Sequence, residues 1–189
     1  MIAIRRARPA DAVAIGAVHV AAWRSAYPGI LPDQFLAGLS IPRQAAHYDQ
    51  AIRSSAAVFV AIASDSDLPT GNTPRIVGFA TAGRSRMREI SGQTLAEGEI
   101  ETLYVLDDWR EHGLGRRLMR AAATHLIEMG CKSVFLWVLR DNPSRWFYQR
   151  LRGRPVAEAN VQVGGQTVKQ TAFVWDPIEK LFEASPLST

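Results

Sequence analysis

The sequence predicts an α+β domain with a layered α/β arrangement, in which a mixed, mostly antiparallel seven-stranded sheet carries helices on both faces. Three observations lead to this fold class. The 189 residues are 47% hydrophobic, which provides enough apolar material for one full core. Segments with strand and helix periodicity follow in the order strand, helices, three strands, helix, strand, helix, two strands. One pair of strands is joined through a helix, so we expect that pair to be parallel.

The N-terminal part is predicted to be a short strand followed by helices. A strand is expected at 2–7, and the Pro-Ala-Asp sequence at 9–11 is a helix-start signal. Apolar residues on a broad face then predict a helix that ends near Ala26. Tyr-Pro-Gly at 27–29 interrupts the chain, and further helical segments are expected between 32 and 52.

The rest of the chain is predicted to supply six strands and two helices. Helices are expected from 114 until Gly130 ends the first, and from 142 until Gly153 ends the second. We expect a single domain at 1–176 and a C-terminal tail at 177–189, with no linker that would divide the chain. The predicted strands are 57–63, 75–82, 99–105, 133–139, 155–163 and 167–175.

Composition limits the function classes. The net charge of +4 suits an anionic ligand, and no basic tract with interleaved aromatic residues is present, so we expect no nucleic-acid partner. Cys131 is the only cysteine and the four histidines lack ligand spacing, so we expect no metal and no disulfide within the chain. No signal peptide or membrane-spanning apolar run occurs, which predicts a cytoplasmic protein without a membrane partner.

The stretch EIETLYVLDDWREHGLGRRL at 99–118 is the most informative part of the sequence. It predicts a strand, a turn with two glycines at 110–115, and the start of a helix. Such a turn lets backbone N–H groups converge, and the helix adds the positive end of its dipole, so the site favours an anion such as phosphate. The alternative is a helix entry without a ligand. Neither the nucleoside-triphosphate loop pattern nor the three-glycine dinucleotide pattern is met.

Two segments carry a resemblance to a known family. LYVLDDWREHGLGRRLM, at 103–119, resembles the acetyl-coenzyme A motif of the GNAT superfamily of N-acetyltransferases, whose pattern is met by Arg110, Gly113 and Gly115. NPSRWFYQRLRGRPV, at 142–156, resembles the family's later segment. The resemblance implies a GNAT-like acyl-CoA acyltransferase fold. It also implies transfer of an acetyl group from acetyl-CoA to a primary amine of a small molecule or peptide, by direct attack in a ternary complex, in a protein that is often a homodimer.

The resemblance also implies how acetyl-CoA would be held. Backbone groups of Leu103, Tyr104 and Val105 would pair with the pantetheine arm like an added strand. Asn142 would contact the same arm. Glu111 departs from the glycine common in the family and places a carboxylate near the pyrophosphate, unless its side chain points to solvent. The turn residues that would hold the pyrophosphate are Arg110, Glu111, His112, Gly113, Leu114, Gly115 and Arg116.

Three residues are candidates for proton transfer. The resemblance places Tyr148 near the sulfur, where a phenol with a pKa of about 10 would protonate the departing thiolate. The alternative for Tyr148 is a core aromatic residue. Glu99 and Glu101 are candidate bases for the acceptor amine, and strand alternation predicts that they share one face with Leu103 and Val105. Their alternative is a solvated acidic strand end.

Trp23 and Tyr27 are the candidate acceptor-binding residues. They fall one helical turn apart, just before the predicted helix break, in a region that roofs the acceptor pocket in the resembled family. Core packing is the alternative for Trp23. A glutamate that some family members carry on the following strand is replaced here by Trp137 or Val138, which removes one alternative base.

Two other functions are compatible with the sequence. One is a non-catalytic acyl-CoA-binding sensor on the same fold, which would bind the cofactor without turnover. The other is a basic nucleic-acid-binding domain, which would bind with a steep dependence on salt.

Overall fold

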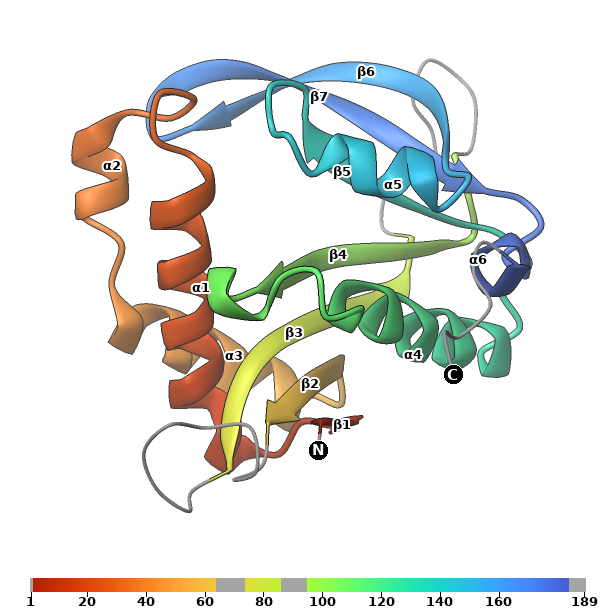
Figure 1. Cartoon of the computed structure of the whole chain (residues 1–189), viewed down its shortest axis with the longest axis horizontal. Helices are drawn as coiled ribbons and strands as arrows, with labels where there is room; N and C mark the ends of the chain where they lie inside the picture. The colour runs from red at the N-terminus through yellow and green to blue at the C-terminus, as the bar shows by residue number, and fades with distance from the viewer. Residues whose placement is uncertain (1, 64–73, 86–94, 184–189) are drawn as a thin grey trace.

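The computed structural model describes residues 2–63, 74–85 and 95–183. Its helices and strands follow the predicted order (Figure 1). The strands are β1 (Ile2–Arg6), β2 (Ala57–Ala63), β3 (Arg75–Arg84), β4 (Gly98–Val105), β5 (Val134–Leu139), β6 (Arg154–Val163) and β7 (Gln166–Trp175). The α-helices are α1 (Ala12–Ala26), α2 (Asp33–Ala37), α3 (Ile41–Arg53), α4 (Leu114–Glu128), α5 (Arg145–Arg150) and α6 (Lys180–Glu183), with 3-10 turns η1 (Pro9–Asp11) and η3 (Asp107–Trp109).

The seven strands form one sheet in the order β1-β2-β3-β4-β5-β7-β6. Among the described strands, β4 and β5 are the one parallel pair, and every other neighbouring pair is antiparallel. The parallel pair is joined through α4, as the crossover rule requires. The predicted mixed, mostly antiparallel seven-stranded sheet is therefore confirmed.

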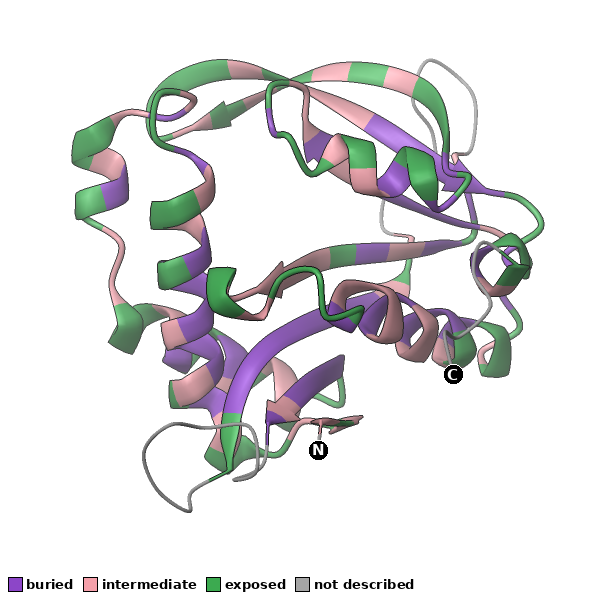
Figure 2. Ribbon diagram, in the orientation of Figure 1, coloured by how far each residue is buried: buried purple, intermediate pink, exposed green. Residues whose placement is uncertain are grey.

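Helices cover both faces of the sheet, and each face has its own apolar cluster (Figures 1 and 2). On one face α4 buries its apolar side against the sheet, and this main cluster includes Leu118, Ala122 and Leu126 together with Ile100 of β4. On the other face α1 and α3 pack through a second cluster that includes Ile15 and Tyr48 with Phe79 of β3. A fully buried aliphatic or aromatic side chain contributes about 1.5–3 kcal/mol, so both faces add to stability.

Residues 177–183, the described part of the predicted C-terminal tail, pack against the rest of the chain. Ile178 and Leu181 are fully buried in the main cluster, and α6 packs against α4. Arg120 of α4 donates a hydrogen bond to the carbonyl of Phe182 at 2.9 Å. Ile178 lies in the turn before α6 and Leu181 lies in the helix, and the N–H of Leu181 donates to the carbonyl of Ile178 at 3.1 Å, so both apolar side chains can face α4. Residues 184–189 lie outside the described part of the chain.

The described residues also show whether the chain has a membrane-spanning helix or a metal-binding cluster. Within residues 2–63, 74–85 and 95–183, no helix is long and apolar enough to cross a bilayer. The same residues contain no group of three or more His, Cys, Asp or Glu side chains placed to hold a metal ion.

Candidate active site

The centre of the candidate site is a split between β4 and β5. These strands pair only at Gly98–Val134 and Glu99–Phe135. Beyond these two positions β4 stays paired with β3, and β5 stays paired with β7. The edges that β4 and β5 turn toward each other therefore carry backbone groups without ladder partners in the described residues. Such an edge can accept an extended ligand as an additional strand.

The end of β4 directs one backbone donor into this split. The N–H of Leu106 donates to the carbonyl of Val77 in β3 at 2.9 Å. Successive N–H groups along a strand point to opposite edges, so the N–H of Val105 points toward the β5 side. A single amide at this position can stabilise negative charge that develops on a carbonyl oxygen.

A β-bulge in β4 corrects the predicted positions of the glutamates. Strict alternation placed Glu99 and Glu101 on the face of Leu103 and Val105. The β3–β4 pairing shifts between Thr81–Thr102 and Ala82–Ile100, so Glu101 is the extra residue of the bulge. As a result Ile100, rather than a glutamate, joins Leu103 and Val105 in the cluster under α4.

The bulge places Glu101 toward α3. Burial raises the pKa of Tyr48, and the negative charge of Glu101 raises it further, in agreement with a carboxylate on the same face of the sheet as this phenol. Tyr48 belongs to the cluster on the α1–α3 face. Glu99 neighbours Ile100 and therefore also points away from α4. Both candidate bases thus lie on the face opposite the main cluster, on the side of Tyr104 and α1.

The turn before α4 has the backbone conformation that an anion site requires. Glu111 and Gly113 have left-handed φ values of 64° and 71°. Gly113 is the N-cap, and no side chain caps the helix. The first helical bond runs from the N–H of Arg117 to the carbonyl of Gly113 at 3.1 Å. The N–H groups that precede Arg117 in the first turn of α4 are therefore open to a ligand.

The arginines around this turn have different tasks. Arg110 forms an ion pair with Asp107 at 2.8 Å, and its carbonyl accepts a hydrogen bond from Nδ1 of His112 at 2.7 Å. Arg117 donates to the carbonyl of Ile2 at 2.9 Å, which ties α4 to β1. The Nε atom of Arg116 is buried and has no hydrogen-bond partner among the described residues. A buried donor without a partner is costly, so this guanidinium suits a bound phosphate.

Asn142 and Tyr148 lie on the other side of the split. Asn142 is 7% exposed, accepts the N–H of Ser144 at 2.9 Å through Oδ1, and donates through Nδ2 to the hydroxyl of Tyr27 at 3.3 Å. Tyr148 is also 7% exposed, and its ring packs against Phe173 with ring centres 5.9 Å apart. Burial raises the pKa of Tyr148, and the nearby phenol of Tyr27 adds to the effect, so Tyr148 stays protonated at neutral pH.

An aromatic wall on α1 faces β4. The ring centres of Trp23 and Tyr27 lie 5.0 Å apart, and the ring centre of Trp23 lies 6.4 Å from that of Tyr104. Trp23 is half-buried, whereas Tyr27 is 7% exposed. Tyr27 packs in a third cluster with Leu31 of the α1–α2 segment. Trp23 is therefore the more accessible of the two predicted acceptor contacts.

A buried His–Tyr pair supports this wall and was not predicted from the sequence. Nδ1 of His19 lies 2.8 Å from the hydroxyl of Tyr48, and the imidazole stacks on Trp23 with ring centres 5.2 Å apart. The ring of Tyr104 lies equally close to His19, at 5.2 Å. The partners stand 29 residues apart, on α1 and α3, so no local spacing signals their contact. Only the packing of two amphipathic helices brings them together.

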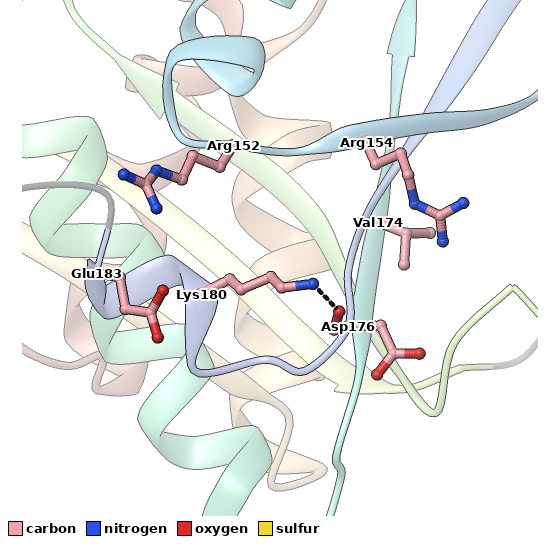
Figure 3. A pocket seen from close by; sticks show the side chains of 6 residues that line it. All are labelled: Arg152, Arg154, Val174, Asp176, Lys180 and Glu183. Carbon is pink, nitrogen blue, oxygen red and sulfur yellow. Dashed lines mark hydrogen bonds between the residues drawn. The ribbon is translucent and has the colours of Figure 1, made fainter.

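A cavity of about 240 Å³ lies at a different place in the molecule (Figure 3). It lies between the end of α5, the β6–β7 pair and α6, away from the turn at 110–116. Lys180 donates a hydrogen bond to the backbone carbonyl of Asp176 there. The lining residues are Arg152, Arg154, Val174, Asp176, Lys180 and Glu183. None of them is a predicted site residue, so we do not assign this cavity to the chemistry of the split.

Comparison with known proteins decides the family. The model of the family described as Acetyltransferase (GNAT) family matches residues 23–153, which is more than half of the chain. The chain belongs to the GNAT family of acetyltransferases. It is similar to the uncharacterized N-acetyltransferase YuaI of Bacillus subtilis (strain 168), with 32% identity over 181 residues that cover 96% of each chain. The predicted family is therefore confirmed. The prediction that the protein is an acetyl-CoA-dependent acyltransferase is confirmed with it.

Solved GNAT structures share the fold. Arabidopsis thaliana NAA60, in complex with a bisubstrate analogue, superposes with a TM-score of 0.68 at 21% identity and covers 93% of this chain and 99% of its own. The Salmonella typhimurium putative acetyltransferase yncA, with its cofactor acetyl-CoA, superposes with a TM-score of 0.62 at 17% identity and covers 100% of this chain and 96% of its own. These likenesses confirm the predicted GNAT-like acyltransferase fold.

In this GNAT chain the predicted residues fall into two groups. The first group surrounds the split and the turn, and it includes the β4 edge, the first turn of α4 and Arg116. The second group makes contacts within the protein. Asn142 is hydrogen-bonded to Tyr27 and Ser144, and Arg110 forms an ion pair with Asp107. Trp137 lies on the face of β5 that carries Phe135 and has a buried indole N–H without a partner in the described chain.

Proposed function

We propose that the protein is an N-acetyltransferase that transfers an acetyl group from acetyl-CoA to a primary amine of a small molecule or peptide, by direct attack in a ternary complex. The single observation that carries the proposal is that the open β4 edge leads, through η3, directly into the uncapped first turn of α4. The β4 edge would pair with an extended pantetheine arm, and the amides of the turn would hold a diphosphate. The acetyl-CoA-bound relative of similar fold agrees with this cosubstrate.

The residues present fit a diphosphate by three independent features. The backbone of Glu111 and Gly113 adopts the left-handed conformation that turns successive N–H groups inward. Gly113 has open space where a Cβ would stand, so the chain leaves room at the turn. The partnerless Nε of Arg116 supplies a cationic donor. Leu103, Tyr104 and Val105 are the proposed partners of the arm.

The chemistry divides between the two sides of the split. The amine nitrogen attacks the thioester carbon, the carbon–sulfur bond breaks, and the thiolate leaves. The Val105 N–H stabilises the carbonyl oxygen as it gains negative charge. Tyr148, which burial keeps protonated at neutral pH, donates its proton to the thiolate as it leaves. The nitrogen of the adduct carries one proton more than the amide product, and release of that proton returns one to the phenolate, so that the thiol, the amide and the neutral phenol remain. No covalent acetyl-enzyme is needed.

The acceptor amine must lose a proton before it attacks. An alkyl ammonium has a pKa of about 10, so a base or a water relay has to remove that proton at neutral pH. Glu101 is the better placed of the two glutamates, because the bulge turns it toward the α1–α3 face that carries the aromatic wall. Glu99 lies on the same side, where the parallel pairing ends. Trp23 lines the acceptor position.

Calorimetric titration with acetyl-CoA tests the cosubstrate, and a thiol-release screen over small amines and peptides tests the reaction. We expect micromolar or tighter binding and release of thiol with at least one amine. Arg116→Ala should weaken binding about tenfold, whereas Arg154→Ala, in the cavity of Figure 3, should not. Loss of binding in Arg154→Ala alone would move the cofactor to that cavity. Binding without turnover over the whole panel would favour a sensor.

A homodimer stays a prediction from the family resemblance. Light scattering coupled to size-exclusion chromatography measures the oligomeric state directly.

A further inference from the structure

We propose that Tyr27 is a positioning residue for Tyr148, because its hydroxyl holds Asn142 and Asn142 in turn fixes the start of α5. The inference rests on the proposed function, since it gives Tyr148 the task of protonating the thiolate. It connects the acceptor side of the site, on α1, to the leaving-group side, on α5.

The hydrogen bonds of Asn142 define this connection. Its Nδ2 donates to the hydroxyl of Tyr27 at 3.3 Å, and its Oδ1 accepts the N–H of Ser144 at 2.9 Å. Its backbone carbonyl accepts the N–H of Arg145 at 3.1 Å, in the first turn of α5. Asn142 itself is 7% exposed. The Asn142 side chain therefore connects the start of α5, the helix that carries Tyr148, to Tyr27 at the end of α1.

Tyr27 is rigid enough to act as an anchor. It is the C-cap of α1, and its N–H donates to the carbonyl of Trp23 at 3.1 Å. Its own carbonyl accepts the N–H groups of Ile30 and Leu31, both at 3.0 Å. Its ring packs edge-on against Trp23 and is 7% exposed. Backbone and ring are thus fixed independently of the hydroxyl.

The direction of the Tyr27–Asn142 bond matters. An amide nitrogen only donates, so the oxygen of Tyr27 accepts and its own proton points away from Asn142. Burial raises the pKa of Tyr27, so the phenol remains neutral and available as an acceptor at neutral pH. Burial raises the pKa of Tyr148 and the phenol of Tyr27 adds to the effect, so the two phenols lie in the same region. Loss of the Tyr27 hydroxyl would leave Nδ2 of Asn142 without a partner, and the α5 start would be free to shift.

The variant Tyr27→Phe tests the proposal because it keeps the ring and removes only the hydroxyl. We expect kcat to fall about tenfold while KM for the amine stays within about twofold. In a Tyr148→Phe background the same change should have no further effect, because Tyr27 acts through Tyr148. The matched control is Tyr48→Phe, which removes another buried phenol hydroxyl, bonded to His19 at 2.8 Å. Its effect should add to that of Tyr148→Phe.

A second measurement does not depend on turnover. Amide hydrogen exchange of Ser144 and Arg145 should speed up about tenfold in Tyr27→Phe and stay unchanged in Tyr48→Phe. Three results would each overturn the proposal. Tyr27→Phe could lower kcat equally in the wild-type and Tyr148→Phe backgrounds, it could raise only the KM for the amine, or it could leave amide exchange at the start of α5 unchanged. A wild-type protein that neither binds acetyl-CoA nor releases thiol would instead refute the proposed function, and the exchange experiment would still decide the role of Tyr27.

Discussion

The buried imidazole of His19 should make the stability of the fold depend on pH. His19 is 9% exposed and lies between Tyr48, Trp23 and Tyr104. Burial, helped by the nearby charge of His47, lowers its pKa from 6.5 to about 4. In the folded protein the imidazole therefore remains neutral at a pH where the unfolded chain already binds a proton.

The sign and size of the effect follow from these two values. The folded pKa of His19 is below the unfolded one, so its full contribution to stability is present above about pH 6.5. This contribution is lost as the pH falls from 6.5 to about 4, and below about pH 4 His19 causes no further loss of stability. The shift of about 2.5 pKa units corresponds to about 3 kcal/mol over the whole range, of which about 2 kcal/mol is lost by pH 5.

Urea unfolding at pH 7.5, 6.0 and 5.0 measures this loss. Between pH 7.5 and 5.0 the wild-type protein should lose about 2 kcal/mol more unfolding free energy than His19→Gln. Asp11, whose pKa is lowered by its hydrogen bond to Arg5, titrates in both proteins, so it cancels in the difference. His112→Gln removes an exposed histidine and serves as the control for the loss of one imidazole. Parallel curves for wild type and His19→Gln would refute the reasoning, because His19 would then be free to bind a proton in the folded state.

Three further predictions address the site itself. Glu101→Gln should lower kcat/KM at pH 7 by about 10²-fold, with a smaller change for Glu99→Gln; the reverse order would assign the base to Glu99. Gly113 has a left-handed φ of 71°, which alanine adopts only at a cost, so Gly113→Ala should lower the free energy of unfolding by about 1 kcal/mol and weaken acetyl-CoA binding. Calorimetry that finds neither effect would contradict the proposal that this turn binds the diphosphate. The ring centre of Phe35 in α2 lies 6.1 Å from that of Trp23, the proposed acceptor contact, and a Cβ on Gly164 of the β6–β7 hairpin would be 2.5 Å from the same ring. Phe35→Ala would open this end of the acceptor position and should raise the peptide-to-small-amine ratio of kcat/KM about tenfold; an unchanged ratio in the thiol-release assay would show that Phe35 does not limit the acceptor.

Features that depend on local chemistry could be predicted from the sequence. The turn before α4 is one, because Gly113 permits a backbone conformation that other residues rarely adopt, and the structure has this glycine at a φ of 71°. The hairpin around Gly164 is another, and both of its glycines have positive φ. In such cases the signal lies within a few adjacent residues.

Features that depend on distant partners could not be predicted in this way. The bulge at Glu101 arises from the register between β3 and β4, so a rule of alternation along one strand placed both glutamates on the wrong face. The His19–Tyr48 pair depends on the packing of α1 against α3. The docking of α6 likewise requires the apolar surface of α4, which no pattern within residues 177–189 reveals.

The bulge also explains how one strand serves two different tasks. In a regular strand of the same sequence, without the bulge, Ile100 would lie on the face opposite Leu103 and Val105, and the core beneath α4 would be interrupted. With the bulge, Ile100 stays fully buried under α4, while Glu101 turns to the α1–α3 face. The helix that carries the proposed anion site is thereby packed on a continuous apolar surface, and the acidic side chains are kept on the acceptor side. The position of the proposed base and the packing beneath the proposed anion-binding turn are therefore consequences of the same irregularity in β4.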